Sequence, residues 1–81
     1  MKQLLKFHAT WCQPCKALSA NFNRVDLGDV ELIDIDIDEK LELAKQYNVR
    51  SVPTIILLEN NIEIKRHSGV LMPDKIEEFI K

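Results

Sequence analysis

The chain has 81 residues, of which 46% are hydrophobic and 30% charged, and its formal net charge is -2. This size and composition indicate one soluble globular domain over residues 1–81 and exclude a disordered tail, which would contain less Leu, Ile and Val. Because 11 basic residues stand against 13 acidic ones and form no basic run, we expect no nucleic-acid partner.

The chain also lacks the apolar segments that membranes and secretion require. No apolar stretch approaches the roughly 20 residues that span a bilayer, so we expect no membrane association. Residues 1–6 lack the apolar core of a signal peptide, and we therefore expect a cytoplasmic protein. Structural disulfides are rare in that reducing compartment. The two cysteines, Cys12 and Cys15, then need another explanation.

The first predicted elements are a strand and a helix. Residues 4–9 have the composition of a short strand. The turn at residues 11–15 leads into a helix, because Pro14 suits a first helical turn. Three apolar residues recur at helical spacing and should face a sheet: Leu18, Phe22 and Val25.

A second strand and a second helix follow the break at Gly28-Asp29. Residues 30–37 form the clearest strand, because isoleucine alternates with aspartate along them. Residues 39–47 should form a helix, since acidic residues at its start suit the helix dipole. Its inward side chains are expected to be Leu41, Ala44 and Tyr47.

The rest of the chain predicts a hairpin and a last helix. Residues 52–58 contain a strong apolar run, and the pair Asn60-Asn61 predicts a two-residue turn, because asparagine tolerates a positive φ. Residues 62–67 return as a strand that Gly69 ends. Pro73 then opens a helix whose apolar face consists of Ile76, Phe79 and Ile80.

Together these patterns predict an α/β fold with the order β-α-β-α-β-β-α. The first two strands must be parallel because a helix joins them, whereas the last two form an antiparallel hairpin. The result is a three-layer sandwich around a mixed four-stranded sheet.

The chemistry of the chain lies in Cys12 and Cys15, whose spacing near a βαβ pattern is typical of a redox motif. A helix N-terminus stabilises a thiolate through free N–H groups and its positive dipole end. We expect Cys12, at the outer end of the helix, to be the exposed and acidified thiol. Cys15, inside the first turn, should be more buried and close enough to attack a sulfur bonded to Cys12. Pro14 stiffens the turn, and Lys16 adds positive charge.

Residues 11–16, with the sequence WCQPCK, closely resemble the active-site motif of thioredoxins, which usually has glycine where Gln13 stands. Residues 50–54, with the sequence RSVPT, resemble the family's second signature, in which the proline, here Pro53, is cis and faces the cysteine pair. Gly69 falls where thioredoxins keep a glycine beside the substrate groove. The resemblance covers the whole chain and implies a thioredoxin-like fold without the family's first strand and helix.

This resemblance implies a protein-disulfide reductase. Cys12 would attack a disulfide in a partner protein, and Cys15 would resolve the mixed disulfide that forms. A thioredoxin reductase or a glutathione system would then reset the pair. A monomer is expected, with no cofactor beyond the Cys12–Cys15 disulfide and no metal. The residues implied to hold or support the partner's chain are Trp11, Gln13, Pro14, Val52, Pro53 and Gly69.

One pair of residues departs from the family pattern. Thioredoxins usually carry a buried Asp six residues before the first cysteine, paired with a Lys on the next strand. Here the first position holds Lys6 and the second, by register from Pro53, holds Asp34. Two hypotheses stay open: an inverted ion pair beneath the active site, or two side chains that point to solvent. A positive Lys6 near the cysteines should favour the thiolate.

The alternation of Asp34, Asp36 and Asp38 admits a metal-site interpretation. An EF-hand, however, needs Gly at loop position six and Glu at position twelve, and these places hold Glu39 and Lys45 when counted from Asp34. We favour a charged edge strand, because loss of the family's first strand leaves residues 30–37 at the sheet edge and charge commonly protects such edges.

The two histidines are the only further ligands available if the cysteines bind zinc, and neither has finger-like spacing to them. The sequence therefore favours a redox pair over a zinc site. His8 is expected to pack over the active-site turn, with a direct acid–base role as the alternative. His67 is expected to be a solvated strand residue.

Two other functions compete with that of a thioredoxin. A glutaredoxin-like reductase would use glutathione, but Trp11 and the pair Gln13-Pro14 do not fit that family. Ser68-Gly69-Val70 also replaces its usual Gly-Gly. A noncatalytic binding module with the same fold is the third hypothesis, which the intact cysteines oppose.

Overall fold

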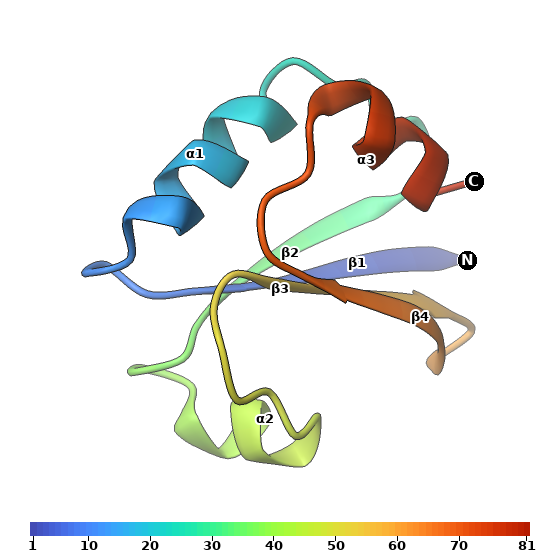
Figure 1. Ribbon diagram of the computed structural model, residues 1–81. Helices are drawn as coiled ribbons and strands as arrows, with labels where there is room; N and C mark the ends of the chain where they lie inside the picture. The colour runs from blue at the N-terminus through green and yellow to red at the C-terminus, as the bar shows by residue number, and fades with distance from the viewer.

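The computed structural model describes all residues 1–81, and its elements follow the predicted order. Strands and helices alternate as β1 (Lys2–His8), α1 (Gln13–Phe22), β2 (Glu31–Asp36), α2 (Leu41–Gln46), β3 (Thr54–Glu59), β4 (Ile62–Ser68) and α3 (Pro73–Phe79). Helices α1 and α3 cover one face of the sheet and α2 covers the other, which gives the three layers seen in Figure 1.

The four strands form one mixed sheet in the order β2-β1-β3-β4. Strand β1 pairs in parallel with β2, and both remaining pairings are antiparallel. The predicted fold class is therefore confirmed, and β2 lies at the sheet edge as expected. In the parallel register Lys6 stands opposite Asp34, which brings the two candidate charges to one place on the sheet.

Two apolar clusters hold the layers together, one on each face of the sheet. Neighbouring residues of a strand point to opposite faces, so Leu4 packs beneath α1 and α3 whereas Leu5 packs against α2. Alternate residues of the apolar run in β3 likewise pack into the two different clusters. This run is continuous because helices cover both faces of the central strands.

The hairpin and the last helix form as predicted. Asn60 and Asn61 both have positive φ, at 53° and 69°, as a two-residue hairpin turn of this kind requires. Pro73 opens α3, and Phe79 and Ile80 pack with the buried Ile76 in the cluster beneath α1.

The second helix differs from its prediction. It begins at Leu41 rather than residue 39, because the amides of Glu39 and Lys40 donate to the Asp36 carbonyl in a turn after β2. Leu41 was expected to point inward, and this was wrong: it is 55% exposed. Leu43 and Tyr47, four residues apart, share the inward face with Ala44, and Leu41 lies off that face.

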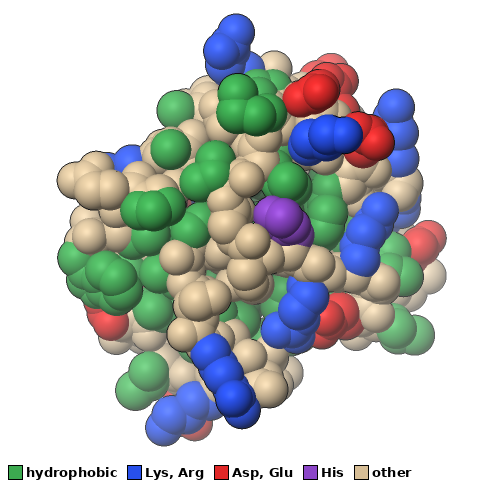
Figure 2. All heavy atoms as spheres, viewed as in Figure 1, with side chains coloured by type: hydrophobic (Ala, Val, Ile, Leu, Met, Phe, Trp, Pro, Cys, Tyr) green, Lys and Arg blue, Asp and Glu red, His purple; other side chains and the backbone are tan.

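The surface carries charge in a mixed arrangement. On the face seen in Figure 2, basic and acidic side chains are interspersed between hydrophobic and neutral areas. The longest helix, α1, has 10 residues, and no helix has the length and apolarity needed to cross a bilayer.

Candidate active site

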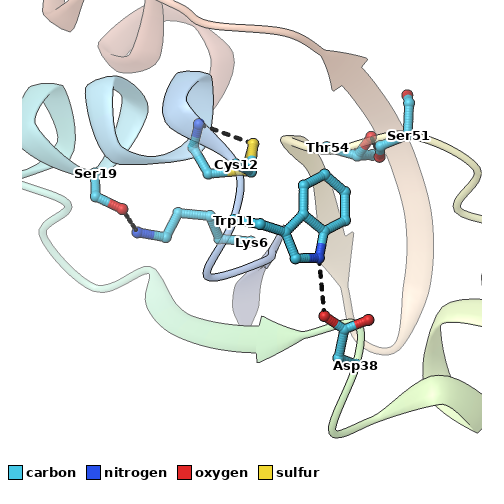
Figure 3. The surroundings of a disulfide bond; sticks show 8 residues. Lys6, Trp11, Cys12, Ser19, Asp38, Ser51 and Thr54 are labelled. Carbon is cyan, nitrogen blue, oxygen red and sulfur yellow. Dashed lines mark hydrogen bonds between the residues drawn. A yellow bond between two sulfur atoms is a disulfide. The ribbon is translucent and has the colours of Figure 1, made fainter.

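The cysteine pair lies where β1 ends and α1 begins. Cys12 is the N-cap of α1 with an extended backbone, and Pro14 occupies the first turn, where its missing N–H costs nothing. Cys12 and Cys15 are joined by a disulfide, with their Cα atoms 5.3 Å apart. The Cys15 amide donates to the Cys12 sulfur at 3.1 Å, as Figure 3 shows.

The same geometry favours negative charge on sulfur. Cys12 faces the free N–H groups and the positive dipole end of α1, and no acidic side chain in the first turn offsets them. Lys16, which is exposed, adds a positive charge one residue after Cys15. A thiolate formed at Cys12 on reduction therefore has hydrogen-bond and charge stabilisation from the start of the helix.

The expected difference in burial between the cysteines is wrong for this disulfide form. Cys12 and Cys15 are each 4% exposed, although Cys12 was expected to be the exposed one. The Cys12 amide donates to the Ala9 carbonyl, so the turn folds back onto the strand end. Ala9 packs with both cysteines in one apolar cluster, and Ile37 and Val52 pack against this cluster.

Trp11 projects from the turn beside the disulfide. It is 66% exposed, as expected for a contact surface rather than a core residue. Its indole N–H donates to the Asp38 carboxylate at 3.0 Å, which fixes the ring against the loop after β2 (Figure 3). Asp38 was not identified as a site residue from the sequence. Its place in the row of aspartates was the only signal.

The loop before β3 approaches the cysteines from the other side. The Val52–Pro53 peptide bond is cis, as the resemblance implied, and half-buried Val52 packs against the cysteine pair. The Thr54 hydroxyl donates to the Ser51 carbonyl at 2.8 Å and so closes this loop. The Gly69 amide donates to the Pro53 carbonyl at 2.9 Å, which joins the loop to the end of β4.

The expected substrate groove is not a cavity in this structure. Four surface cavities are present, and none is lined by Trp11, Val52, Pro53 and Gly69 together. Trp11 is exposed, Val52 and Gly69 are half-buried, and Pro53 is buried. Gln13 is exposed at the start of α1, beside Pro14.

Lys6 and Asp34 form an ion pair, which was one of the two hypotheses that the sequence left open. The Lys6 ammonium lies 3.0 Å from the Asp34 carboxylate, so the alternative of two solvated side chains is wrong for Lys6. The Lys6 side chain is 7% exposed and that of Asp34 is 55% exposed, so only the cation is buried. Its ammonium also donates to the Ser19 hydroxyl at 2.8 Å (Figure 3). The same ammonium lies over the Phe22 ring.

Ser19, which accepts the hydrogen bond from Lys6, lies on the same helix as Cys15. It stands four residues after Cys15, which places both side chains on the same face of α1. Ser19 was not identified from the sequence. Its spacing of four residues from Cys15, on the helix that covers β1, could have indicated it. Cys15 and Ser19 both line a surface cavity of about 380 Å³, whose lining also includes His8 and Lys16.

The three aspartates of the alternating row have three separate roles. Asp34 binds Lys6, Asp36 accepts the Asp38 amide at 2.8 Å, and Asp38 binds Trp11. No group of three or more His, Cys, Asp or Glu side chains is placed to hold a metal ion. The aspartates thus do more than charge an edge strand.

The sequence is similar to known proteins of one family along its whole length. The family model described as Thioredoxin matches residues 1–81. Thioredoxin of Mycoplasma genitalium is 35% identical over 75 residues, which are 90% of this chain and 74% of that protein. Thioredoxin H5 of Oryza sativa subsp. japonica is 40% identical over 78 residues, 94% of this chain and 58% of that protein.

Solved structures agree with the sequence relatives. The N21Q mutant thioredoxin from Halobacterium salinarum superposes with a TM-score of 0.89 at 32% identity. The match covers 98% of this chain and 71% of the halobacterial chain.

Proposed function

The chain belongs to the thioredoxin family and is a thiol-disulfide oxidoreductase of that type, and we propose the residue roles and partners that follow. Residues 1–81 work as one domain that reduces disulfides of other proteins. The observation that carries this proposal is the Cys12–Cys15 disulfide at the N-terminus of α1, between Trp11 and the cis-proline loop.

In the proposed cycle, Cys12 is the attacking thiolate. Its sulfur attacks one sulfur of the partner's disulfide, the partner's S–S bond breaks, and the second partner sulfur leaves with the electron pair. The Cys15 thiolate then attacks the Cys12 sulfur and releases the first partner sulfur. The partner gains two electrons, and the Cys12–Cys15 bond forms as the two cysteines lose them.

The partner's chain would lie across an open surface around the disulfide. Trp11 offers an exposed ring held by Asp38, and Val52 touches the cysteine pair. Pro53 and Gly69 are joined by a backbone hydrogen bond at the far side, which supports their assignment to one binding surface. Gln13 and Pro14 border it at the start of α1.

Lys6 is proposed to support the thiolate of Cys15. Its buried ammonium binds Ser19, one turn beyond Cys15 on α1, and a cation at this place favours the charged form of a nearby thiol. Asp34 pairs with this cation from the solvent side, which compensates the burial of the Lys6 side chain.

The electron donor is proposed to be a thioredoxin reductase rather than glutathione. The match of the whole chain to the thioredoxin family supports this choice. We propose a monomer in the cytoplasm, although relatives include proteins named as mitochondrial thioredoxins. The redox-active disulfide is the only reacting group we assign, with no metal and no bound cofactor.

A coupled assay tests this function. The protein, NADPH and a thioredoxin reductase should reduce insulin and consume NADPH, whereas glutathione with glutathione reductase should support little turnover. Cys12→Ser and Cys15→Ser variants should both lose turnover. Activity with the glutathione system alone would contradict the proposal, and inactivity of the folded protein in both systems would indicate a binding module.

A further inference from the structure

The resolving step leaves one proton without an assigned acceptor. Cys15 must be a thiolate when it attacks the Cys12 sulfur, because the thiol itself is a poor nucleophile. Cys15 is only 4% exposed in the disulfide form, and only one of the four surface cavities is lined by it. A group that takes the proton must lie in the space that Cys15 itself faces.

That space is the cavity of about 380 Å³ beside α1. Its polar lining side chains are His8, Thr10, Lys16, Ser19 and Asn23. Hydroxyls, an amide and an ammonium do not accept a proton near neutral pH, whereas a neutral imidazole does. His8 is thus the only lining side chain suited to this step.

The position of His8 on β1 explains why it reaches this cavity. Lys6 and His8 are two residues apart on one strand and therefore point to the same face, the face that α1 covers. His8 is half-buried, and its ring makes no hydrogen bond to any other group of the chain. Both ring nitrogens are consequently available for proton exchange.

The charged pair next to His8 cannot replace it. Lys6 is a cation that already donates to Ser19 and Asp34. Asp34 lies in the adjoining cavity of about 520 Å³, which His8 also lines but Cys15 does not. His8 therefore lines both the cavity that contains Cys15 and the cavity that contains Lys6 and Asp34.

The charges around His8 come from three elements. Lys6 is on its own strand, and Lys16 faces it across the Cys15 cavity from α1. From β2, Asp34 faces it across the second cavity, and Asp36 stands opposite it in the strand register. Two cations and two carboxylates thus surround the imidazole, and the thiol of Cys15 is the remaining titratable group of its cavity.

We propose that His8 accepts the proton of Cys15 during resolution of the mixed disulfide, directly or through water in the shared cavity. The Cys15 S–H proton passes to a ring nitrogen, and the thiolate attacks the Cys12 sulfur. The bond between Cys12 and the partner's sulfur breaks, and its electron pair leaves with that sulfur. The imidazolium then returns the proton to the released thiolate or to solvent.

This role rests on the proposed two-step function, so its test separates the steps. Reduced protein is mixed rapidly with dithiobis(nitrobenzoate), an aromatic disulfide whose release is followed by absorbance. Attack by Cys12 releases the first thionitrobenzoate, and resolution by Cys15 releases the second. His8→Gln should slow the second release by about a hundredfold, the lower end of the range for general acid–base catalysis, and leave the first unchanged.

The matched control is His67→Gln, the same change in the other histidine, which should alter neither release. The wild-type second release should rise with pH through an inflection that His8→Gln removes. Added imidazole should accelerate the second release in a His8→Ala variant, in which the cavity is enlarged. A merely structural role for His8 would give neither the lost inflection nor the rescue.

A second release in His8→Gln with the wild-type rate and pH profile would overturn the proposal. If His8→Gln fails to fold, the proposal can still be tested on the wild-type protein. The inflection must coincide with the titration of the His8 ring signal in NMR spectra, and a mismatch refutes the role. Absence of the first release would instead contradict the proposed function itself, so the two failures are distinct.

Discussion

The Lys6 ammonium lies 3.0 Å from the Asp34 carboxylate, and the two residues stand directly opposite each other in the parallel pairing of β1 and β2. The cation is almost fully buried while the carboxylate is 55% exposed. The pair is therefore asymmetric: removing the anion leaves a buried charge without its partner, whereas removing the cation leaves a solvated carboxylate.

Asp34→Asn should consequently destabilise the protein more than Lys6→Met. We expect Asp34→Asn to lower the free energy of unfolding by about 1 kcal/mol, because partial exposure weakens the pair. Lys6→Met keeps the volume and removes the charge, and should cost less. Urea denaturation checks both, with Asp29→Asn as control, since Asp29 is exposed. A larger loss in Lys6→Met than in Asp34→Asn would contradict this asymmetry.

Asp38→Ala should release Trp11 without unfolding the protein. Both side chains are exposed, so we expect a stability change of no more than about 0.5 kcal/mol. Trp11 is the only tryptophan, and its fluorescence anisotropy should fall in Asp38→Ala as the ring gains freedom. The KM for a protein disulfide should rise with little change in kcat. Glu39→Ala, one residue further on, is the control; an equal anisotropy change there would exclude a specific Trp11–Asp38 role.

Gly69→Ala should lower the free energy of unfolding more than Gly28→Ala does. Gly69 has φ of 106°, beyond the left-handed helical region, and its amide binds the Pro53 carbonyl. Gly28 has φ of 59°, which alanine reaches at about 1 kcal/mol. Neither added methyl group would clash, so strain alone sets the difference. We expect Gly69→Ala to lose about 1–3 kcal/mol and also turnover. Equal losses in both variants, measured by thermal unfolding, would argue against strain at Gly69.

Glu63 should make stability depend on pH. Two hydrogen bonds from Arg66 and its positive charge lower the pKa of the Glu63 carboxyl. A carboxyl with a lowered folded-state pKa contributes stability above its unfolded value, and this contribution is lost as pH falls through the folded value. The pair is one-third exposed, so Glu63→Gln should cost at most about 0.5 kcal/mol at pH 7.

This difference between wild type and Glu63→Gln should disappear in acid, where the carboxyl is protonated in both the folded and the unfolded chain. Urea titrations at several pH values measure it. Glu77→Gln serves as control because Glu77 is exposed on α3. A difference that persists or grows in acid would contradict the sign of the effect.

Much of the fold was predictable because local patterns agreed with the tertiary structure. The apolar run of β3, the Asn60-Asn61 turn and Pro73 each identified an element that formed. The register of Lys6 opposite Asp34 followed from the position of Pro53. The prediction for Leu41 failed because the turn at Asp36 moves the helix start to residue 41. Backbone amides bound to the Asp36 carbonyl and one amide bound to its carboxylate form this turn, and hydrophobic periodicity does not indicate such bonds.

The site was less predictable than the fold. The cysteine motif gave the redox pair, but the burial of Cys12 depends on Ile37 and Val52, which approach from distant segments. Ser19 and Asp38 each bind a site residue from another element, and no local pattern marks such contacts. The sequence motif thus identified the reacting cysteines, whereas their burial and contacts depend on residues from distant parts of the chain.

Trapping of the mixed disulfide tests the central claim, that Cys12 attacks and Cys15 resolves. Reduced Cys15→Ser and Cys12→Ser variants are incubated with a disulfide-bonded test protein, and adducts are measured by mass spectrometry over time. Cys15→Ser should accumulate a stable adduct at Cys12, while Cys12→Ser forms one slowly or not at all. Adduct formation at Cys15 in Cys12→Ser that is as fast as at Cys12 in Cys15→Ser would contradict the account.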